Sequence, residues 1–151
     1  MDKEIEKLPF TDKPTKSMLF ELVKRKRKYE AFKAKCLLWQ VLTFILCGVF
    51  FVYLYTILYL PFNGQIAYML KQFINDGRNG LFVLVIGASY ATALYFKKKE
   101  DKKEKEFHAL RCEIIDKSTD LWKSEEAWKE RDQIFAFMKK KFDINLYFES
   151  K

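Results

Sequence analysis

The sequence has few of the residues from which catalytic, metal-binding or disulfide-rich sites are built. Its 151 residues include three cysteines, one histidine, five glycines and three prolines. An odd number of cysteines without metal-ligand spacing does not indicate a disulfide framework. A single histidine leaves no second imidazole for a conventional acid–base relay. No glycine-rich phosphate loop, HExxH, GxSxG or CxxC motif occurs. These absences predict a protein that is not an enzyme and needs no cofactor.

One arrangement of potential metal ligands is present. Glu104, His108 and Cys112 lie four residues apart and would share one face of a helix. They stand in a stretch dense in lysine and glutamate, where a lone histidine is usually a solvated side chain. We therefore expect no metal at this position.

Charged residues make up 32% of the chain but are absent from two segments. Leu37–Leu60 contains no Asp, Glu, Lys or Arg and exceeds the ~20 residues that a helix needs to cross a membrane. Leu81–Phe96 is also uncharged but shorter, so it spans only if Lys97 and Lys98 extend it by snorkelling. Its alternative is a re-entrant or interfacial helix. We interpret both segments as transmembrane helices, since so small a chain could hardly cover the first with protein.

The excess of basic residues behind the net charge of +8 lies beside these two segments. A membrane-tethered chain of this kind favours anionic lipids over nucleic acid as a partner, although a simple solvated face remains the alternative. The connecting loop carries only Lys71 and Arg78, so the positive-inside rule places both termini in the cytoplasm. The expected lipid-facing basic flanks are Lys24, Arg25, Lys26, Arg27 and Lys28 before the first segment, and Lys97, Lys98 and Lys99 after the second.

The fold class predicted is an all-α membrane protein with a two-helix transmembrane hairpin in the cell membrane. The loop should contain turns at 61–64 and 75–80 around a short amphipathic helix, because apolar residues recur at helical spacing from Ile66 to Ile74. In chain order, the segments are a cytoplasmic N-terminal tail with a basic amphipathic helix (1–36), transmembrane helix 1 (37–60), an external loop with an interfacial helix (61–80), transmembrane helix 2 (81–96), and a cytoplasmic charged helical region with a short C-terminal extended tail (97–151).

The N-terminal region is expected to begin as a loose tail. Residues 1–14 mix charges with two prolines and show no sustained period. Thr15 then offers an N-cap for a helix in which Leu19, Leu22 and Val23 recur at helical spacing. We expect this helix to lie near the membrane.

The C-terminal region should be helical from the point where it leaves the second apolar segment, because residues 97–151 contain neither glycine nor proline. Apolar residues recur every seven positions in this region, as at the a positions of a coiled coil, but several of the corresponding d positions are polar. This pattern favours two amphipathic helices over one long coiled coil. The break falls at 118–124, where Ser124 is a credible N-cap. Alternating residues after Phe142 predict an extended tail that packs on the helices or pairs with another sheet edge. The seven-residue repeat consists of Phe107, Ile114, Leu121, Trp128, Phe135 and Phe142.

Two hypotheses of function follow. The first is a membrane-anchored interaction or scaffold protein that binds a protein partner or a second copy through exposed aromatic residues, namely Trp122, Trp128, Phe135 and Phe142. The second is an accessory subunit of a membrane complex, or a small oligomeric pore, that acts through the hairpin. It rests on small residues four apart between Gly87 and Ala93, which would pack against the bulky first segment or against another copy. The pairs are Gly87 with Ala91, Ala88 with Thr92, and Ser89 with Ala93.

The layout of two close apolar segments with a charged tail and the terminal string DINLYFES resembles the YpbF-like family of small membrane proteins from spore-forming Gram-positive bacteria. The resemblance covers most of the chain. It implies a bacterial cell membrane and adds no catalytic or binding residue.

Overall fold

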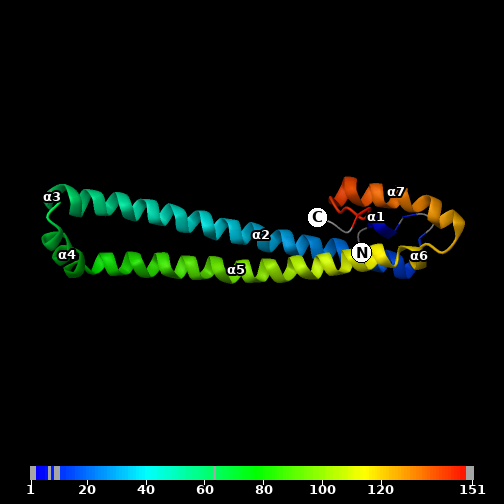
Figure 1. The fold of residues 1–151 in the computed structure, drawn as a ribbon, viewed down its shortest axis with the longest axis horizontal. Coiled ribbons are helices and arrows are strands. Elements are labelled where there is room, and N and C mark those ends of the chain that lie inside the picture. The colour runs from blue at the N-terminus through cyan, green and yellow to red at the C-terminus, as the bar shows by residue number, and fades with distance from the viewer. Residues whose placement is uncertain (1–2, 7, 9–10, 63, 149–151) are drawn as a thin grey trace. The chain divides into compact units, whose positions relative to one another are not determined.

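The computed structural model describes residues 3–6, 8, 11–62 and 64–148, which form helices and turns and include no strand. The prediction of an all-helical fold is thus confirmed for this part of the chain. Figure 1 shows the elements in order: α1 (Lys3–Glu6), α2 (Lys13–Leu54), the π-helical turn η1 (Tyr55–Tyr59), α3 (Leu60–Phe62), α4 (Ile66–Asn75), α5 (Gly77–Asp116), α6 (Ser118–Leu121) and α7 (Glu125–Phe142).

The helices form two compact units. Unit 1 comprises Met1–Ala31 and Glu100–Lys151, and unit 2 comprises Phe32–Lys99. Both α2 and α5 contribute to both units without a helix end at the boundary. The sequence boundaries at 36/37 and 96/97 therefore mark changes in composition and not in backbone conformation. The helix predicted to emerge directly from the second apolar segment is confirmed by α5.

In unit 2, α2 and α5 run antiparallel (Figure 1). The rings of Phe32 and Phe96 lie 6.5 Å apart, and those of Phe50 and Phe82 lie 5.5 Å apart. Residue numbers thus rise along one helix as they fall along the other. The contacting positions recur at intervals of three and four, which keeps one face of each helix against the other.

The outward faces of these two helices are apolar. Two helical stretches, Lys13–Phe62 and Gly77–Asp116, are long and apolar enough to cross a membrane. Only 6% and 17% of their most apolar windows are buried by protein. Phe44 and Leu84, for example, are 81% and 72% exposed. A soluble core helix would bury most of such side chains, so this surface needs a cover that the described residues do not supply.

The chain leaves α2 through a widened helical turn. In η1 the N–H of Leu60 bonds to the carbonyl of Tyr55, five residues earlier. Pro61 follows, and its ring would crowd the carbonyl four residues before it in an α-helix, so a wider turn accommodates it. The reversal is completed at Gly64, whose φ of 83° lies in the left-handed region that glycine adopts without strain.

The loop helix predicted between the two turns is confirmed by α4. Of its regularly spaced apolar residues, Ile66 and Ile74 are exposed and Phe73 is partly buried. The second predicted turn is shorter than expected. Only Asp76 interrupts the helix, and α5 begins at Gly77.

Unit 1 is built around one hydrophobic core that both ends of the chain share. Phe107 and Ile114 of α5 lie in the same cluster as Leu19 and Leu22 of α2, together with Ile5 of α1. The prediction of a loose tail over 1–14 is therefore wrong for the described residues, since Ile5 is fully buried. The apolar face of the N-terminal helix packs on protein rather than on a membrane, because the C-terminal helices cover it.

The start of α2 also differs from the prediction. The helix begins at Lys13, and Pro14 occupies its first turn, where a missing N–H has no helical partner to lose. The N–H of Lys16 bonds to the carbonyl of Asp12 at 2.9 Å. Thr15 is thus buried inside the first turn and is not the N-cap.

The restart at α7 follows the sequence prediction, whereas the first part of the predicted break at 118–124 forms the short helix α6. The Ser124 hydroxyl accepts a hydrogen bond from the N–H of Ala127 at 3.1 Å, and Glu125 and Glu126 stand in the first turn. There their negative charges interact favourably with the positive end of the helix dipole and stabilise the helix. The predicted N-cap is confirmed, and α5 and α7 fold against each other as two amphipathic helices.

The C-terminal tail packs on these helices. Asp143 adopts φ 53°, and the N–H of Ile144 bonds to the carbonyl of Met138 at 3.1 Å, as in a Schellman ending. Ile144 and Leu146 are buried in the unit 1 core. The first predicted alternative for the tail is therefore confirmed for residues up to 148, and it forms no strand there.

Candidate functional site

A hollow with an exposed aromatic wall lies at the start of α7 in unit 1. Its volume is about 510 Å³, within the range of small ligand pockets. It lies where the chain passes from α6 to α7 through three non-helical residues, 122–124. Its lining residues are Thr119, Trp122, Lys123, Ser124, Glu125, Trp128 and Lys129.

Trp128 forms the open wall of this hollow. It is 40% exposed, and the guanidinium carbon of Arg131 lies 3.9 Å from the centre of its ring. Arg131 is also held by Asp132, whose carboxylate oxygen is 3.1 Å from a guanidinium nitrogen. A cation stacked on one face of the ring restrains the indole. Trp128 is therefore preorganised for contact with a binding partner.

Trp122 forms the inner wall and belongs to the core. It is 1% exposed, and its ring meets that of Phe135 edge to face at 5.5 Å. Its indole N–H is buried and has no hydrogen-bond partner within the described residues. A buried donor in this state costs about 1–3 kcal/mol. A ligand that brought an acceptor oxygen to this N–H would remove that cost.

The four aromatic residues predicted to contact a partner have different fates. The expected exposure is wrong for Trp122 and Phe135, because both complete the core that α5 and α7 enclose. Phe142 is partly buried, with the Arg27 guanidinium 5.9 Å from its ring centre. Trp128 alone of the four is freely exposed. The seven-residue repeat placed Trp128, Phe135 and Phe142 on one face and could not tell which of them would be covered.

The first basic flank is divided between surface and interior. Lys24, Arg27 and Lys28 are exposed, as expected of a lipid-facing flank. Arg25 instead donates a hydrogen bond to the carbonyl of Glu106 at 3.0 Å. In the second flank Lys97, Lys98 and Lys99 are all exposed.

The expectation that Lys26 faces lipid is wrong. Its ammonium is buried at the end of α7, where it donates hydrogen bonds to the carbonyls of Phe142 at 2.7 Å and Asp143 at 2.5 Å. It also lies 3.0 Å from a carboxylate oxygen of Asp143. The last carbonyls of a helix carry partial negative charge and lack helical partners, so a cation there stabilises the helix end.

The small residues of α5 do not all pack inside the hairpin. Gly87, Ala88 and Ala91 are exposed, and a Cβ added at Gly87 would meet nothing within 4 Å. Ser89 faces α2 in their place, with its hydroxyl 2.8 Å from that of Thr43. The predicted packing of small residues inside the hairpin is therefore wrong for Gly87, Ala88 and Ala91 but not for Ser89 and Ala93, which are buried there. Self-association through the exposed small residues stays a prediction.

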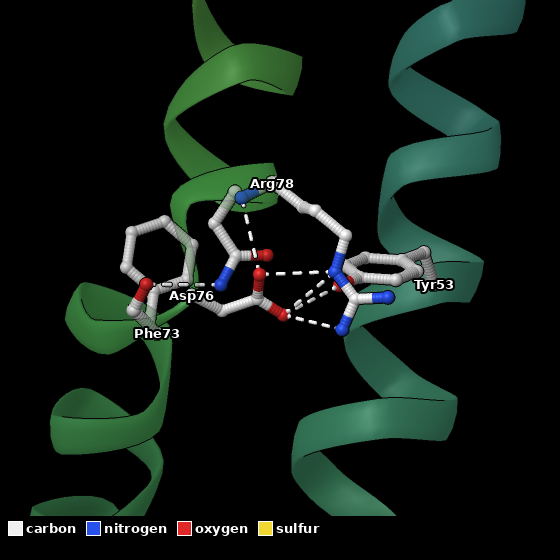
Figure 2. A network of polar contacts seen from close by, with 5 residues as sticks. Tyr53, Phe73, Asp76 and Arg78 are labelled. Carbon is white, nitrogen blue, oxygen red and sulfur yellow. Dashed lines mark hydrogen bonds and ion pairs between the residues drawn. The ribbon is translucent and has the colours of Figure 1, made fainter.

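A polar network fixes the junction of α4 and α5 in unit 2 (Figure 2). The Asp76 carboxylate accepts hydrogen bonds from Nε of Arg78 at 3.0 Å, from Nη2 of Arg78 at 2.8 Å and from the Tyr53 hydroxyl at 3.2 Å. The buried Asn79 amide donates to the carbonyl of Phe73 at 2.9 Å. Hydrogen bonds and charge from Arg78 lower the pKa of Asp76 from 3.8 to about 2.

This ion pair predicts a pH dependence. Because the pKa of Asp76 is lower in the folded chain, its stabilising effect is present above pH about 4 and is lost as the pH falls toward 2. Arg78→Ala should raise the Asp76 pKa toward its ordinary value, as followed by NMR titration of the carboxyl carbon. Lys71→Ala, which removes an exposed cation from α4, should leave it unchanged. A midpoint that stays near 2 in Arg78→Ala would contradict the assigned cause.

Charge pairs along the unit 1 part of α5 and just after it are local, and they are partly or fully exposed. Lys103 donates to Glu106 at 2.7 Å and lowers the pKa of that carboxyl. Lys117 donates to Glu113 at 2.7 Å, which lowers the pKa of Glu113 and raises that of Lys117. Exposed pairs at this spacing contribute little to stability, and they mark no binding site.

The potential metal ligands form no metal site in the described part of the chain. Nε2 of His108 lies 3.8 Å from a carboxylate oxygen of Glu104. No group of three or more His, Cys, Asp or Glu side chains that could hold a metal ion is found among the described residues.

These features define a class: an all-helical protein with two apolar helices of membrane length and a second helical unit that both ends of the chain complete. The sequence model of a family described as "Protein of unknown function (DUF2663)" matches residues 18–149, and the chain belongs to this family. A relative from Bacillus subtilis (strain 168), described as "Uncharacterized protein YpbF", is 44% identical over 142 residues. The match covers 94% of this chain and 93% of the relative, so the resemblance to YpbF is confirmed. No solved structure matches the chain.

Proposed function

We propose that the protein is a non-enzymatic, membrane-anchored interaction protein. Unit 2 crosses the cell membrane as a helical hairpin, and unit 1 lies in the cytoplasm with both termini. The exposed apolar faces of α2 and α5 support the anchor, because lipid is the cover that such surfaces require. The exposed cations Lys24, Lys28 and Lys97 support the orientation, since each contributes about 1 kcal/mol beside anionic lipid.

The interaction role rests on the hollow at the start of α7. Trp128 is exposed, restrained by Arg131 and placed beside a cavity that is large enough for one or two side chains of a protein partner. Tryptophan in such a setting is the residue that most often dominates a protein interface.

A site-specific crosslinking experiment tests this role. A photoreactive residue at Thr119, which lines the hollow, should crosslink to a protein partner in intact cells. Trp128→Ala should reduce the crosslinked product at least tenfold, since the loss of a dominant interface residue costs about 2 kcal/mol or more. Phe148→Ala is the matched control, because Phe148 is an exposed aromatic residue outside the hollow.

Point substitutions are sharper here than truncation. Removing the chain after Lys105 would also uncover Leu19 and Leu22, because their core partners lie beyond that point. Loss of capture could then reflect unfolding. Crosslinking that is unaffected by Trp128→Ala, or equally reduced by Phe148→Ala, would contradict the proposed surface.

The alternative, an accessory subunit or small oligomeric pore, is favoured by one observation. The face carrying Gly87, Ala88 and Ala91 points away from α2 and has open space at Gly87. Small residues let a second helix approach closely within a bilayer. If two differently tagged copies co-purify regardless of Trp128→Ala but separate on Gly87→Leu, this alternative replaces the cytoplasmic hollow as the site of action.

A further inference from the structure

Unit 2 contains a lateral groove between α2 and α5, with a volume of about 300 Å³. Two small side chains, Cys47 on α2 and Ala93 on α5, leave this space along the helix pair. Phe44 and Leu94 also line it, and both are exposed at the outer surface of the pair. The groove therefore opens to whatever surrounds the hairpin.

The groove is polar at one end and apolar at the other. The antiparallel pairing sets Cys36 beside Ala93 and Thr43 beside Ser89, so Lys97 stands at the end of the groove nearest the basic flanks. Side chains on a helix lean toward its N-terminus. Lys97 on α5 and Gln40 on α2 consequently lean toward each other along the groove, while Cys47 and Phe44 lie deeper.

This order of chemistry matches that of a phospholipid. We propose that the groove binds one anionic phospholipid, with its phosphate on the ammonium of Lys97 and the amide of Gln40, and one acyl chain along Phe44 and Cys47. The proposal rests on the proposed membrane location of unit 2. The ammonium of Lys97 in the lining is complementary in charge to a negative headgroup. The volume fits a segment of a single chain at the lower limit of ligand pockets.

A headgroup test separates the groove from general attraction to a basic surface. The full chain is purified with mixed phosphatidylglycerol and phosphatidylethanolamine, and the retained lipid is counted by native mass spectrometry. We expect one tightly retained phosphatidylglycerol. Lys97→Gln should lower its retention at least fivefold, whereas Lys98→Gln, the same charge change on a residue outside the groove, should not.

A steric test changes no charge. Cys47→Trp should fill the deep end of the groove and lower retention to the level of Lys97→Gln, while Val49→Trp, at an exposed position outside the groove on the same helix, should retain the lipid. Equal losses from Lys97→Gln and Lys98→Gln would overturn the site, as would retention in Cys47→Trp or equal retention of phosphatidylethanolamine. A chain that purifies monodisperse without detergent would instead overturn the membrane location itself.

Discussion

Trp122→Ala is expected to destabilise unit 1 by about 3–5 kcal/mol, the usual cost of removing a buried tryptophan and leaving a cavity. Trp122 is almost fully buried and packs edge to face on Phe135 within the core. The stability of a whole domain is only about 5–15 kcal/mol, so the variant should populate an opened unit 1. Hydrogen exchange of α7 amides in the full chain measures this opening directly.

Trp128→Ala serves as the control for that result. Its side chain is partly exposed and loses mainly the contact with Arg131, which is worth about 0.5–1 kcal/mol at an exposed site. Exchange in α7 should therefore stay close to that of the unchanged chain. Equal acceleration in the two variants would show that Trp128 also supports the core, and it would remove Trp128 as a clean probe of partner binding.

The second large effect concerns the membrane. Val49→Lys places a charge near the middle of the first apolar segment, at a side chain that is 52% exposed. At the centre of a transmembrane helix a lysine raises the apparent free energy of insertion by about 2.5–3.5 kcal/mol. We expect a smaller fraction of the full chain to remain in membranes after alkaline extraction.

If water surrounds the helix instead of lipid, we expect Val49→Lys to have little effect. An exposed lysine on a soluble helix changes stability by no more than about 0.5 kcal/mol and increases solubility. Ser17→Lys, at an exposed position of α2 in unit 1, supplies the matched control and should not alter extraction. If Val49→Lys behaves like Ser17→Lys, the apolar faces of unit 2 are not in lipid.

The sequence was most informative where the cause of structure is local. Ser124 caps α7 as predicted, because a hydroxyl three residues before a free N–H is a short-range arrangement. Helix α4 lies between its two turns as the periodicity from Ile66 to Ile74 indicated. The prediction of Thr15 as a cap shows the limit of such signals: Pro14 could begin the helix equally well, and the helix starts at Lys13.

Pairings between distant segments were not predictable in the same way. Periodicity shows that Leu19 and Leu22 share a face, but not that α5 and α7 cover this face in place of lipid. Lys26 looked like any member of its basic run until the end of α7 was found beside it. Gly87 belongs to a small-residue face that could pack on the first apolar segment or on a second copy of the chain. The structure leaves the space at Gly87 open.

By itself the sequence predicted the helical fold of the described residues, the two segments that are long and apolar enough to cross a membrane, and the charges that gather beside them. These properties depend on composition and on neighbours within a few positions. Only the tertiary structure decided that both ends build one core, that Trp122 lies inside it and Trp128 outside, and that Lys26 closes a helix end. A periodic apolar face specifies that it must be buried, but many surfaces satisfy that requirement about equally, and the choice among them is made by packing of the whole unit.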